Sequence, residues 1–228
     1  MMISKLEWDS NFFGYDVAKI VLDNESEINL SITKPFVLTY LFSAEHKSEI
    51  ENKLVDIKCN YIKEIKKVVI ENTIEIDEYK VHINSFDEIK ELVFLSGIYS
   101  RFRKDPKFTN NEFEKMYSIW FQKSLFNCGS GIGKVFIIKE EKIIVGFVTL
   151  DFEDSNNARI GLIATGLNAQ GKGYASKLIK RCEKECLSRN ISYLKVATQG
   201  LNEAANGLYK KNNFILDSKT YIYHHWNK

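Results

Sequence analysis

The sequence predicts an α/β protein in which a mixed, mostly antiparallel sheet is flanked by helices. Three β-rich runs separated by polar turns lie between residues 134 and 165, which is the pattern of consecutive antiparallel strands. Apolar residues then recur at helical spacing between residues 174 and 186, which indicates an amphipathic helix. Strand-like and helical segments also alternate in the first third of the chain, which predicts a small N-terminal α/β unit.

The composition excludes several classes of protein. The 228 residues carry 32 Lys and Arg against 30 Asp and Glu, so no excess of positive charge points to a nucleic-acid partner. No run of 18 apolar residues is present, so neither a transmembrane helix nor a membrane partner is expected. Residues 1–14 lack the apolar stretch of a secretory signal, and four cysteines do not make a disulfide framework. The protein is therefore expected in the cytoplasm.

The first 78 residues are predicted to form the small α/β unit. Its expected elements are two strands, a helix and a third strand, at residues 16–22, 36–42, 44–57 and 62–70. The helix is indicated by Ile50, Leu54 and Ile57, which recur at helical spacing. The polar stretch 71–78 is the best candidate for a junction, which gives a division into domains 1–78 and 79–228.

The larger domain is predicted to begin with a short strand at residues 81–83. Ser85 and Glu88 form a capping-box pattern for a helix that runs to about Leu95. Asn110 or Asn111 caps a second helix, whose buried face is formed by Phe113, Met116, Tyr117, Trp120 and Phe121.

Strands and helices alternate through the rest of this domain. The remaining expected elements are antiparallel strands at 134–138, 143–150 and 159–165, a helix from Tyr174, a strand at 193–197, a helix at 203–211 and one or two strands within 214–226. The third of the antiparallel strands is expected to be central in the sheet.

The strongest chemical signal is the turn Gln170-Gly171-Lys172-Gly173-Tyr174-Ala175, which stands between a strand and an amphipathic helix. Its glycines allow positive φ or close approach of a ligand. The free N–H groups of the following helix make an anion site, to which Lys172 adds charge. The alternative is a plain glycine turn, and the spacing does not fit a dinucleotide-binding GxGxxG.

This turn resembles the acyl-CoA pyrophosphate loop of the GNAT superfamily of N-acetyltransferases, with Gln170, Gly173 and Ala175 at matching positions. The element order from residue 81 also resembles that fold, over about two-thirds of the chain. The resemblance implies a GNAT-like domain with acetyl-CoA as co-substrate. The loop residues that would bind it are Gln170, Gly171, Lys172, Gly173, Tyr174 and Ala175.

Residues 202–214 resemble a second signature of that superfamily, with Asn202, Ala205, Tyr209 and Phe214 at matching positions and Asn213 where glycine is usual. The resemblance implies that Asn202 and Ala205 lie along the pantetheine arm and that Tyr209 faces the thioester sulfur. A phenol is a reasonable proton donor to a departing thiolate. Taken alone, a helical Tyr followed by two lysines is more often a surface anchor.

The resemblance also implies a bulged strand whose backbone N–H groups stabilise the oxyanion. That strand includes Ile163, Ala164 and Thr165. Only a backbone role is assigned to these three residues.

Two further stretches, 6–14 and 100–108, resemble the dTDP-fucosamine acetyltransferases, which N-acetylate a nucleotide-linked 4-amino-4,6-dideoxy sugar for surface polysaccharide. Arg101 and Arg103, on an extended segment before Pro106, would point the same way and suit a diphosphate, and Phe102 and Phe108 could contact the base or sugar. The alternative is a charged surface loop in which Asp105 pairs internally. Trp8 and Phe13 are expected in the core.

No metal is expected. Cys182 and Cys186 share a helix face and are read as core residues, and His224-His225 as part of the last strand rather than as zinc ligands. No nucleophile and base stand out, so direct transfer is the simpler mechanism. Two rivals stay open: a GNAT enzyme for another amine, and a non-catalytic acyl-CoA-binding module. A homodimer is suggested only by the family resemblance, and no other feature of the sequence bears on it.

Overall fold

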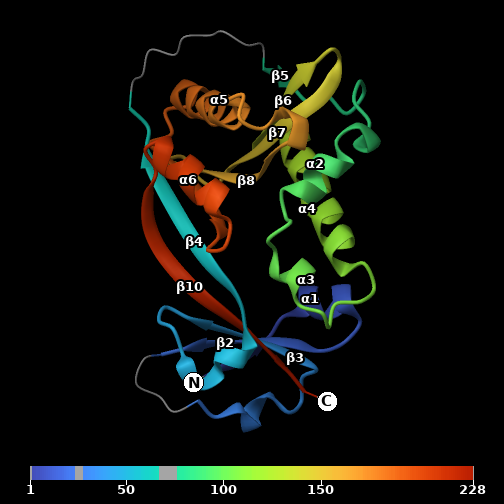
Figure 1. The fold of residues 1–228 in the computed structure, drawn as a ribbon, viewed down its shortest axis with the longest axis vertical. Helices are drawn as coiled ribbons and strands as arrows, with labels where there is room; N and C mark the ends of the chain where they lie inside the picture. Colours follow the sequence, from blue (N-terminus) through green and yellow to red (C-terminus); the bar gives the residue numbers. More distant parts are fainter. Residues whose placement is uncertain (1, 24–27, 67–75, 228) are drawn as a thin grey trace.

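One continuous sheet runs through the whole molecule (Figure 1). The computed structural model describes residues 2–23, 28–66 and 76–227. Within them the strand order is β1-β2-β3-β10-β4-β9-β8-β7-β6-β5. The strands are β1 (Ile3–Lys5), β2 (Val17–Leu22), β3 (Leu38–Ser43), β4 (Leu54–Glu64), β5 (Asp77–Glu78), β6 (Gly133–Glu140), β7 (Ile143–Phe152), β8 (Asn157–Thr165), β9 (Tyr193–Gln199) and β10 (Ile215–Trp226).

Helices cover both faces of the sheet. The α-helices are α1 (Glu7–Phe13), α2 (Lys90–Leu95), α3 (Arg101–Lys104), α4 (Glu112–Gly129), α5 (Tyr174–Ser188) and α6 (Glu203–Lys211). Short 3₁₀ helices are η1 (Leu30–Thr33), η2 (Ser48–Lys53), η3 (Phe86–Glu88) and η4 (Leu167–Ala169). Figure 1 shows α5 and α6 on one side of the sheet and α2, α3 and α4 on the other.

The alternation of side chains along the central strands builds a core on each face. On β7, Phe147 packs with α2 and α4, whereas the next residue, Val148, packs with α5. Cys182 and Cys186 are buried in the α5 cluster with free thiols, as expected of core residues. The prediction of a mixed α/β sheet flanked by helices is confirmed.

Two long strands connect the N-terminal part to the rest. β4 lies between β10 and β9, and β10 continues past it to pair with β3. The expected one or two C-terminal strands are thus a single strand, and the place beside β9 is taken by a strand from the N-terminal part. The division into domains 1–78 and 79–228 stays a prediction, although the hydrogen-bonded sheet crosses it.

Several local predictions are confirmed. The capping box of Ser85 and Glu88 is formed at the start of η3, and α4 follows Asn111 and buries its apolar face. β6, β7 and β8 are antiparallel, and β8 lies between β7 and β9 as the predicted central strand.

Two predicted elements are wrong. The helix over 44–57 is reduced to η2, because Leu54 and Ile57 belong to β4, where long-range pairing with β10 outweighs their helical spacing. The strand over 81–83 is a turn closed by hydrogen bonds from Ile83 and Asn84 to the Lys80 carbonyl. Most of the expected junction 71–78, and the end of the strand over 62–70, lie outside the described residues.

Candidate active site

The two parallel strands at the centre of the sheet separate toward their carboxyl ends. β8 and β9 pair from Asn157–Tyr193 to Ile160–Val196 and no further. Beyond this point β8 continues for five residues beside β7, and β9 continues beside β4. A gap therefore opens between β8 and β9 (the strand gap), which exposes backbone groups that a neighbouring strand would otherwise occupy.

A β-bulge bends β8 where the gap begins. The pairing of β7 with β8 shifts register between Val148 and Leu150, so Thr149 faces two residues, Gly161 and Leu162. The Leu162 N–H donates to the Thr149 hydroxyl at 2.9 Å, which replaces the missing ladder bond. The Thr149 side chain thus fixes the geometry of the bulge.

We expect Gly161→Ala to destabilise the bulge. A Cβ on Gly161 would lie 2.8 Å from the Thr149 hydroxyl oxygen, which would displace that hydroxyl from the buried Leu162 N–H. An unsatisfied buried donor costs about 1–3 kcal/mol in the free energy of unfolding, measurable by urea denaturation. Gly207→Ala is the matched control, because a Cβ there meets no neighbour within 4 Å. Equal stability of both variants would contradict this role of Thr149.

The hydrogen-bond pattern identifies which N–H groups face the gap. The N–H groups of Leu162 and Gly166 both point toward β7, where they bond to Thr149 and to the Val145 carbonyl. Successive residues of an antiparallel strand direct their N–H groups to opposite sides, so those of Ile163 and Thr165 point into the strand gap. Ala164, which we grouped with them from the sequence, directs its N–H toward β7.

The glycine turn leads from the end of β8 to α5. Gly171 and Gly173 both adopt φ of +77°, in the left-handed region, and Gly173 is the N-cap of α5. The first intrahelical bond is made by the Lys177 N–H. Among the described residues no acceptor pairs with the N–H groups of residues 174–176, so the turn presents the unsatisfied donors of an anion site.

A charged side chain from a neighbouring strand borders this turn. Lys172 donates to both carboxylate oxygens of Glu140, at 2.8 and 3.1 Å, and the Tyr174 hydroxyl donates to the same carboxylate. The Lys172 and Tyr174 hydrogen bonds lower the pKa of Glu140, which stays ionised. The Lys172 ammonium group is therefore held by Glu140 and does not point toward the free N–H groups of the turn. No local pattern predicts this contact between residues 172 and 140.

Helix α6 borders the gap from the other side. Asn202 is the N-cap of α6. Its side-chain oxygen accepts a hydrogen bond from the Ala205 N–H at 3.0 Å, so this oxygen caps the helix. The helix ends before Asn213, which adopts φ of +62° as expected of the residue that replaces glycine. Asn206, which the sequence did not single out, ties α6 to β9 and β4 through the Gln199 carbonyl and the Tyr61 hydroxyl.

Tyr209 is buried on this helix rather than exposed as a surface anchor. Its side chain is 2% exposed and its ring packs against Tyr61 and Phe214. Burial raises its pKa far above that of an ordinary phenol, so the hydroxyl stays protonated at neutral pH. No described residue forms a hydrogen bond with that hydroxyl.

The prediction that Arg101 and Arg103 point the same way is wrong. Both lie on the short helix α3, where residues two apart do not share a face. The Arg101 guanidinium lies inward over the rings of Tyr40 and Phe102, at 4.9 and 4.5 Å from the centroids. Arg103 is half exposed and faces Glu114 at 3.8 Å.

The aromatic residues near these arginines also differ from expectation. Phe102 is buried, and Phe108 packs against Phe13 and Trp226, so both belong to the core instead of a ligand surface. Phe13 packs against this core as expected. Trp8 does not, because it is 50% exposed and, within the described part of the chain, its ring stacks only on its helix neighbour Phe12.

Arg101 lies in a cluster of polar side chains between α3 and the N-terminal strands (the Arg101 cluster). Its Nε is buried and has no hydrogen-bond partner among the described residues. The carboxyl groups of Asp9 and Asp56 both interact electrostatically with it. His224, on β10, packs against Tyr40 in the same cluster, and its buried Nε2 likewise has no described partner.

Asp105, the C-cap of α3, orients His224. Its carboxylate accepts hydrogen bonds from His224 Nδ1 at 2.5 Å and from the Trp226 indole at 2.9 Å. Burial lowers the pKa of His224 to about 4, against the opposing effect of Asp105. His224 is therefore neutral, with its proton on Nδ1 and a lone pair on Nε2. The internal pairing of Asp105 matches one alternative from the sequence, but its partner was not foreseen.

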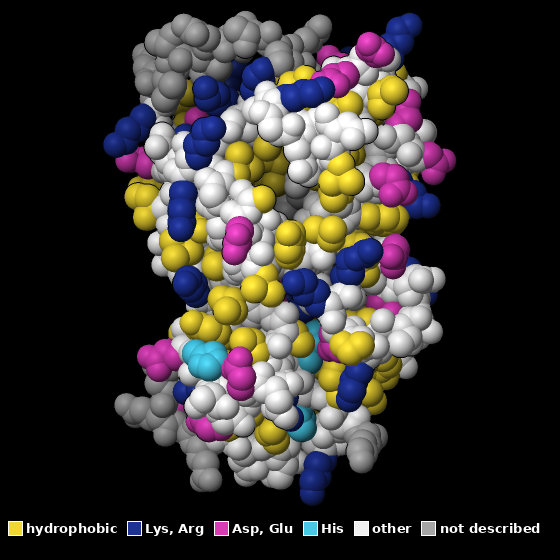
Figure 2. All heavy atoms as spheres, in the orientation of Figure 1, with side chains coloured by type: hydrophobic (Ala, Val, Ile, Leu, Met, Phe, Trp, Pro, Cys, Tyr) yellow, Lys and Arg dark blue, Asp and Glu magenta, His cyan; other side chains and the backbone are white. Residues whose placement is uncertain are grey.

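The surface is hollowed at the strand gap. Figure 2 shows a hollow bordered mainly by hydrophobic side chains, at the height of β8 and between α6 and α4 of Figure 1. A pocket of about 360 Å³ lies between α2 and the chain that follows β8, and its lining includes Leu92, Leu95 and residues 166–169. An apolar wall with a few convergent polar groups is typical of small-molecule sites.

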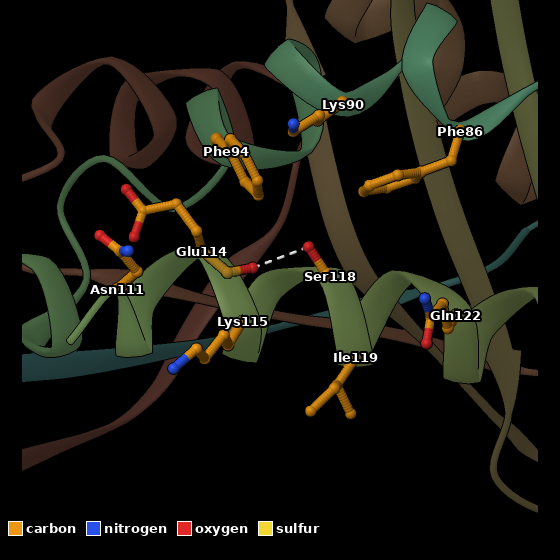
Figure 3. A pocket seen from close by; sticks show the side chains of 9 residues that line it. All are labelled: Phe86, Lys90, Phe94, Asn111, Glu114, Lys115, Ser118, Ile119 and Gln122. Carbon is orange, nitrogen blue, oxygen red and sulfur yellow. Dashed lines mark hydrogen bonds between the residues drawn. The ribbon is translucent and has the colours of Figure 1, made fainter.

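A larger groove lies outside this region. It measures about 670 Å³ and separates Phe86, Lys90 and Phe94 from the side chains of α4 (Figure 3). On α4 the Ser118 hydroxyl donates to the Glu114 carbonyl at 2.7 Å. The residues that line the groove lie on neither β8, β9, α5 nor α6, so it is not the strand gap.

Among the described residues no helix has the length and hydropathy needed to span a bilayer.

One relative matches part of the chain in sequence. The protein YxbD of Bacillus subtilis (strain 168) is 30% identical over 95 residues, which are 41% of this chain and 56% of that protein. The match thus spans about half of the relative's length.

Solved structures share the fold. A conserved protein of unknown function from Staphylococcus epidermidis has a TM-score of 0.64 at 10% identity, with 93% of this chain and 84% of that chain covered. An acetyltransferase assigned to the GNAT family from Novosphingobium aromaticivorans has a TM-score of 0.55 at 13% identity, with 84% and 75% covered. The PaiA N-acetyltransferase of Thermoplasma acidophilum, solved with coenzyme A, has a TM-score of 0.50 at 16% identity, with 68% and 100% covered.

The sequence profile of the acetyltransferase (GNAT) family matches residues 97–214, just over half of the chain. This match spans the glycine turn, the strand gap and α6. For that domain it confirms the predicted enzyme class, an acetyltransferase with acetyl-CoA as co-substrate. The chain therefore belongs to the acetyltransferase (GNAT) family.

Proposed function

We propose that the protein transfers an acetyl group from acetyl-CoA to the 4-amino group of a nucleotide-linked 4-amino-4,6-dideoxy sugar, with dTDP as the nucleotide, for surface polysaccharide synthesis. The observation that supports it is the position of the strand gap between an anion site at α5 and a second polar site at Arg101. A donor and an acceptor that both carry phosphate groups would then approach the gap from its two ends.

The proposed donor site follows from the backbone. The N–H groups at the start of α5 would bind the pyrophosphate of acetyl-CoA, and the open space beside Gly171 and Gly173, which carry no side chain, leaves room for its close approach. The pantetheine arm would occupy the strand gap beside Asn202 and Ala205. The thioester oxygen would accept from the N–H groups of Ile163 and Thr165, which are fixed before the reaction begins.

The proposed acceptor site is the Arg101 cluster. Arg101 acts there on the carboxylates of both Asp9 and Asp56, and Lys58 and Lys104 act on Asp56 as well, so three basic side chains are available near the place proposed for the anionic ligand. A partly buried guanidinium with an unused donor is suited to a diphosphate. Arg103, which lies on the outer side of α3, is not needed for this contact.

Transfer would be direct. The amine nitrogen attacks the thioester carbon, the carbonyl oxygen gains negative charge near the Ile163 and Thr165 N–H groups, and the thiolate departs. Tyr209 would donate a hydrogen bond or its proton to the sulfur, because burial keeps its phenol protonated. No covalent enzyme intermediate is required.

A panel of acceptors tests this proposal. Mass spectrometry after incubation with acetyl-CoA should show one added acetyl group on dTDP-4-amino-4,6-dideoxygalactose, with smaller yields from other nucleotide amino sugars. Acetylation of peptide N-termini or small amines alone would identify another amine as the acceptor. Binding of acetyl-CoA without turnover on any amine would support a non-catalytic acyl-CoA-binding module instead.

Arg101→Gln should raise the KM of the acceptor by about 10- to 150-fold and leave the KM of acetyl-CoA nearly unchanged. This range corresponds to the loss of a charge-assisted hydrogen bond, roughly 1.5–3 kcal/mol. Steady-state kinetics with each substrate varied in turn would measure it, together with a melting curve. Arg103→Gln is the matched control on the outer side of α3. Equal acceptor KM values for the two folded variants would exclude Arg101 from the acceptor site.

A further inference from the structure

A carboxylate lies at the open end of the strand gap. The last residue pair between β4 and β9 joins Lys58 to Gln199, and the chain leaves the sheet after Gly200, whose N–H donates to the Ile57 carbonyl at 2.6 Å. Asp56 is thus the first side chain of β4 beyond the end of β9. β9 lies between β4 and β8 where the three strands are paired, and β8 diverges from β9 beyond Ile160.

Strand alternation places Asp56 on the acceptor side of the sheet. Its neighbours Ile57, Cys59 and Tyr61 pack in the cluster beneath α5 and α6, which also contains Tyr209. Because successive side chains point to opposite faces, Asp56 lies on the other face, where α3 packs against β4. Asp56 and Tyr209 therefore approach the gap from opposite faces.

The surroundings of Asp56 leave its carboxylate available. The cations that act on it are Arg101 and Lys104 from α3 and Lys58 from β4, and the Tyr117 phenol faces it from α4. Among the described residues, none of these cations places a nitrogen within 4.0 Å of an Asp56 carboxylate oxygen, so Asp56 forms no ion pair with them. Burial raises the pKa of Asp56 to about 6, against the lowering effect of Arg101, the Ile57 N–H, Lys104 and Lys58.

We propose that Asp56 is the general base of the transfer, which accepts a proton from the acceptor ammonium directly or through one water. This inference rests on the proposed function. The nitrogen loses one proton to Asp56, and its freed electron pair forms the C–N bond. The C–S bond then breaks, the sulfur leaves with its electron pair and is protonated, and the nitrogen loses its second proton. Asp56 returns its own proton to solvent.

The ionisation of Asp56 sets the expected pH dependence. A base acts only when deprotonated, so kcat at saturating acceptor should fall as the pH drops through about 6. Asp56→Asn preserves shape, so the fold and acetyl-CoA affinity should survive. The loss of a placed base should lower kcat by about 10²–10⁴-fold and remove the acidic limb near pH 6. Formate should partly restore the activity of Asp56→Ala, which a merely structural carboxylate would not allow.

The matched control is Asp217→Asn, which changes an exposed carboxyl on the adjacent strand β10 and should keep wild-type kcat and pH profile. An active wild type whose acidic limb persists in Asp56→Asn would overturn the role of Asp56 and leave the proposed function intact. If Asp56→Asn does not fold, the wild type alone decides: a kcat that does not fall as the pH drops through about 6 would equally overturn the role of Asp56. A wild type that acetylates no amine would instead refute the proposed function, and this inference with it.

Discussion

Tyr209→Phe is expected to lower kcat by about 10²–10⁴-fold, the usual worth of a placed proton donor. The substitution removes one hydroxyl and leaves the packing of the ring against Tyr61 and Phe214 in place, so fold and cofactor binding should survive. Because burial raises the pKa of Tyr209 far above its usual range, its ionisation lies above the pH of ordinary assays. The pH profile should therefore keep its shape, in contrast to the effect expected for Asp56→Asn.

Tyr61→Phe is the matched control for this experiment. Tyr61 is buried in the same cluster, and its hydroxyl donates to Asn206 at 2.7 Å. Its loss should cost about 1 kcal/mol in the free energy of unfolding and change kcat little. A folded, CoA-binding Tyr209→Phe variant with near-normal kcat would make Tyr209 a packing residue and leave the proton donor unassigned.

Gly173→Val is expected to abolish measurable binding of acetyl-CoA. Gly173 has φ of +77° at the N-terminus of α5, where a β-branched residue is strained and its methyl groups would occupy the space of the pyrophosphate. Calorimetric titration with acetyl-CoA measures the effect.

Gly131→Val separates backbone strain from ligand exclusion. Gly131 has φ of +75° and open space around its Cα, in the turn after α4. Both variants should lose similar stability, but Gly131→Val should bind acetyl-CoA like the wild type. Wild-type affinity in Gly173→Val would refute the assignment of the glycine turn as the pyrophosphate site.

The sequence was most informative where the chemistry is local. The glycine turn and the helix over 203–211 depend on neighbours within a few residues, and both form at the predicted positions. The capping box at Ser85 forms for the same reason. These motifs specify backbone conformation through contacts that are close in the chain.

Long-range contacts account for what the sequence could not predict. Helical spacing at Ile50, Leu54 and Ile57 is overridden by the pairing of β4 between β9 and β10. That pairing brings Asp56 to the strand gap, and no local pattern distinguishes it from the other acidic residues. Arg101 and His224 are likewise separated by more than 100 residues in the chain and meet only because β10 crosses to β3.

The crystal structure of the protein with bound acetyl-CoA tests the central claim most directly. We predict the pyrophosphate against the N–H groups of residues 171–176 and the pantetheine arm in the gap between β8 and β9. The thioester oxygen should lie within hydrogen-bond distance of the Ile163 or Thr165 N–H. A cofactor bound elsewhere, such as in the groove between α2 and α4, with the gap left empty, would contradict the account.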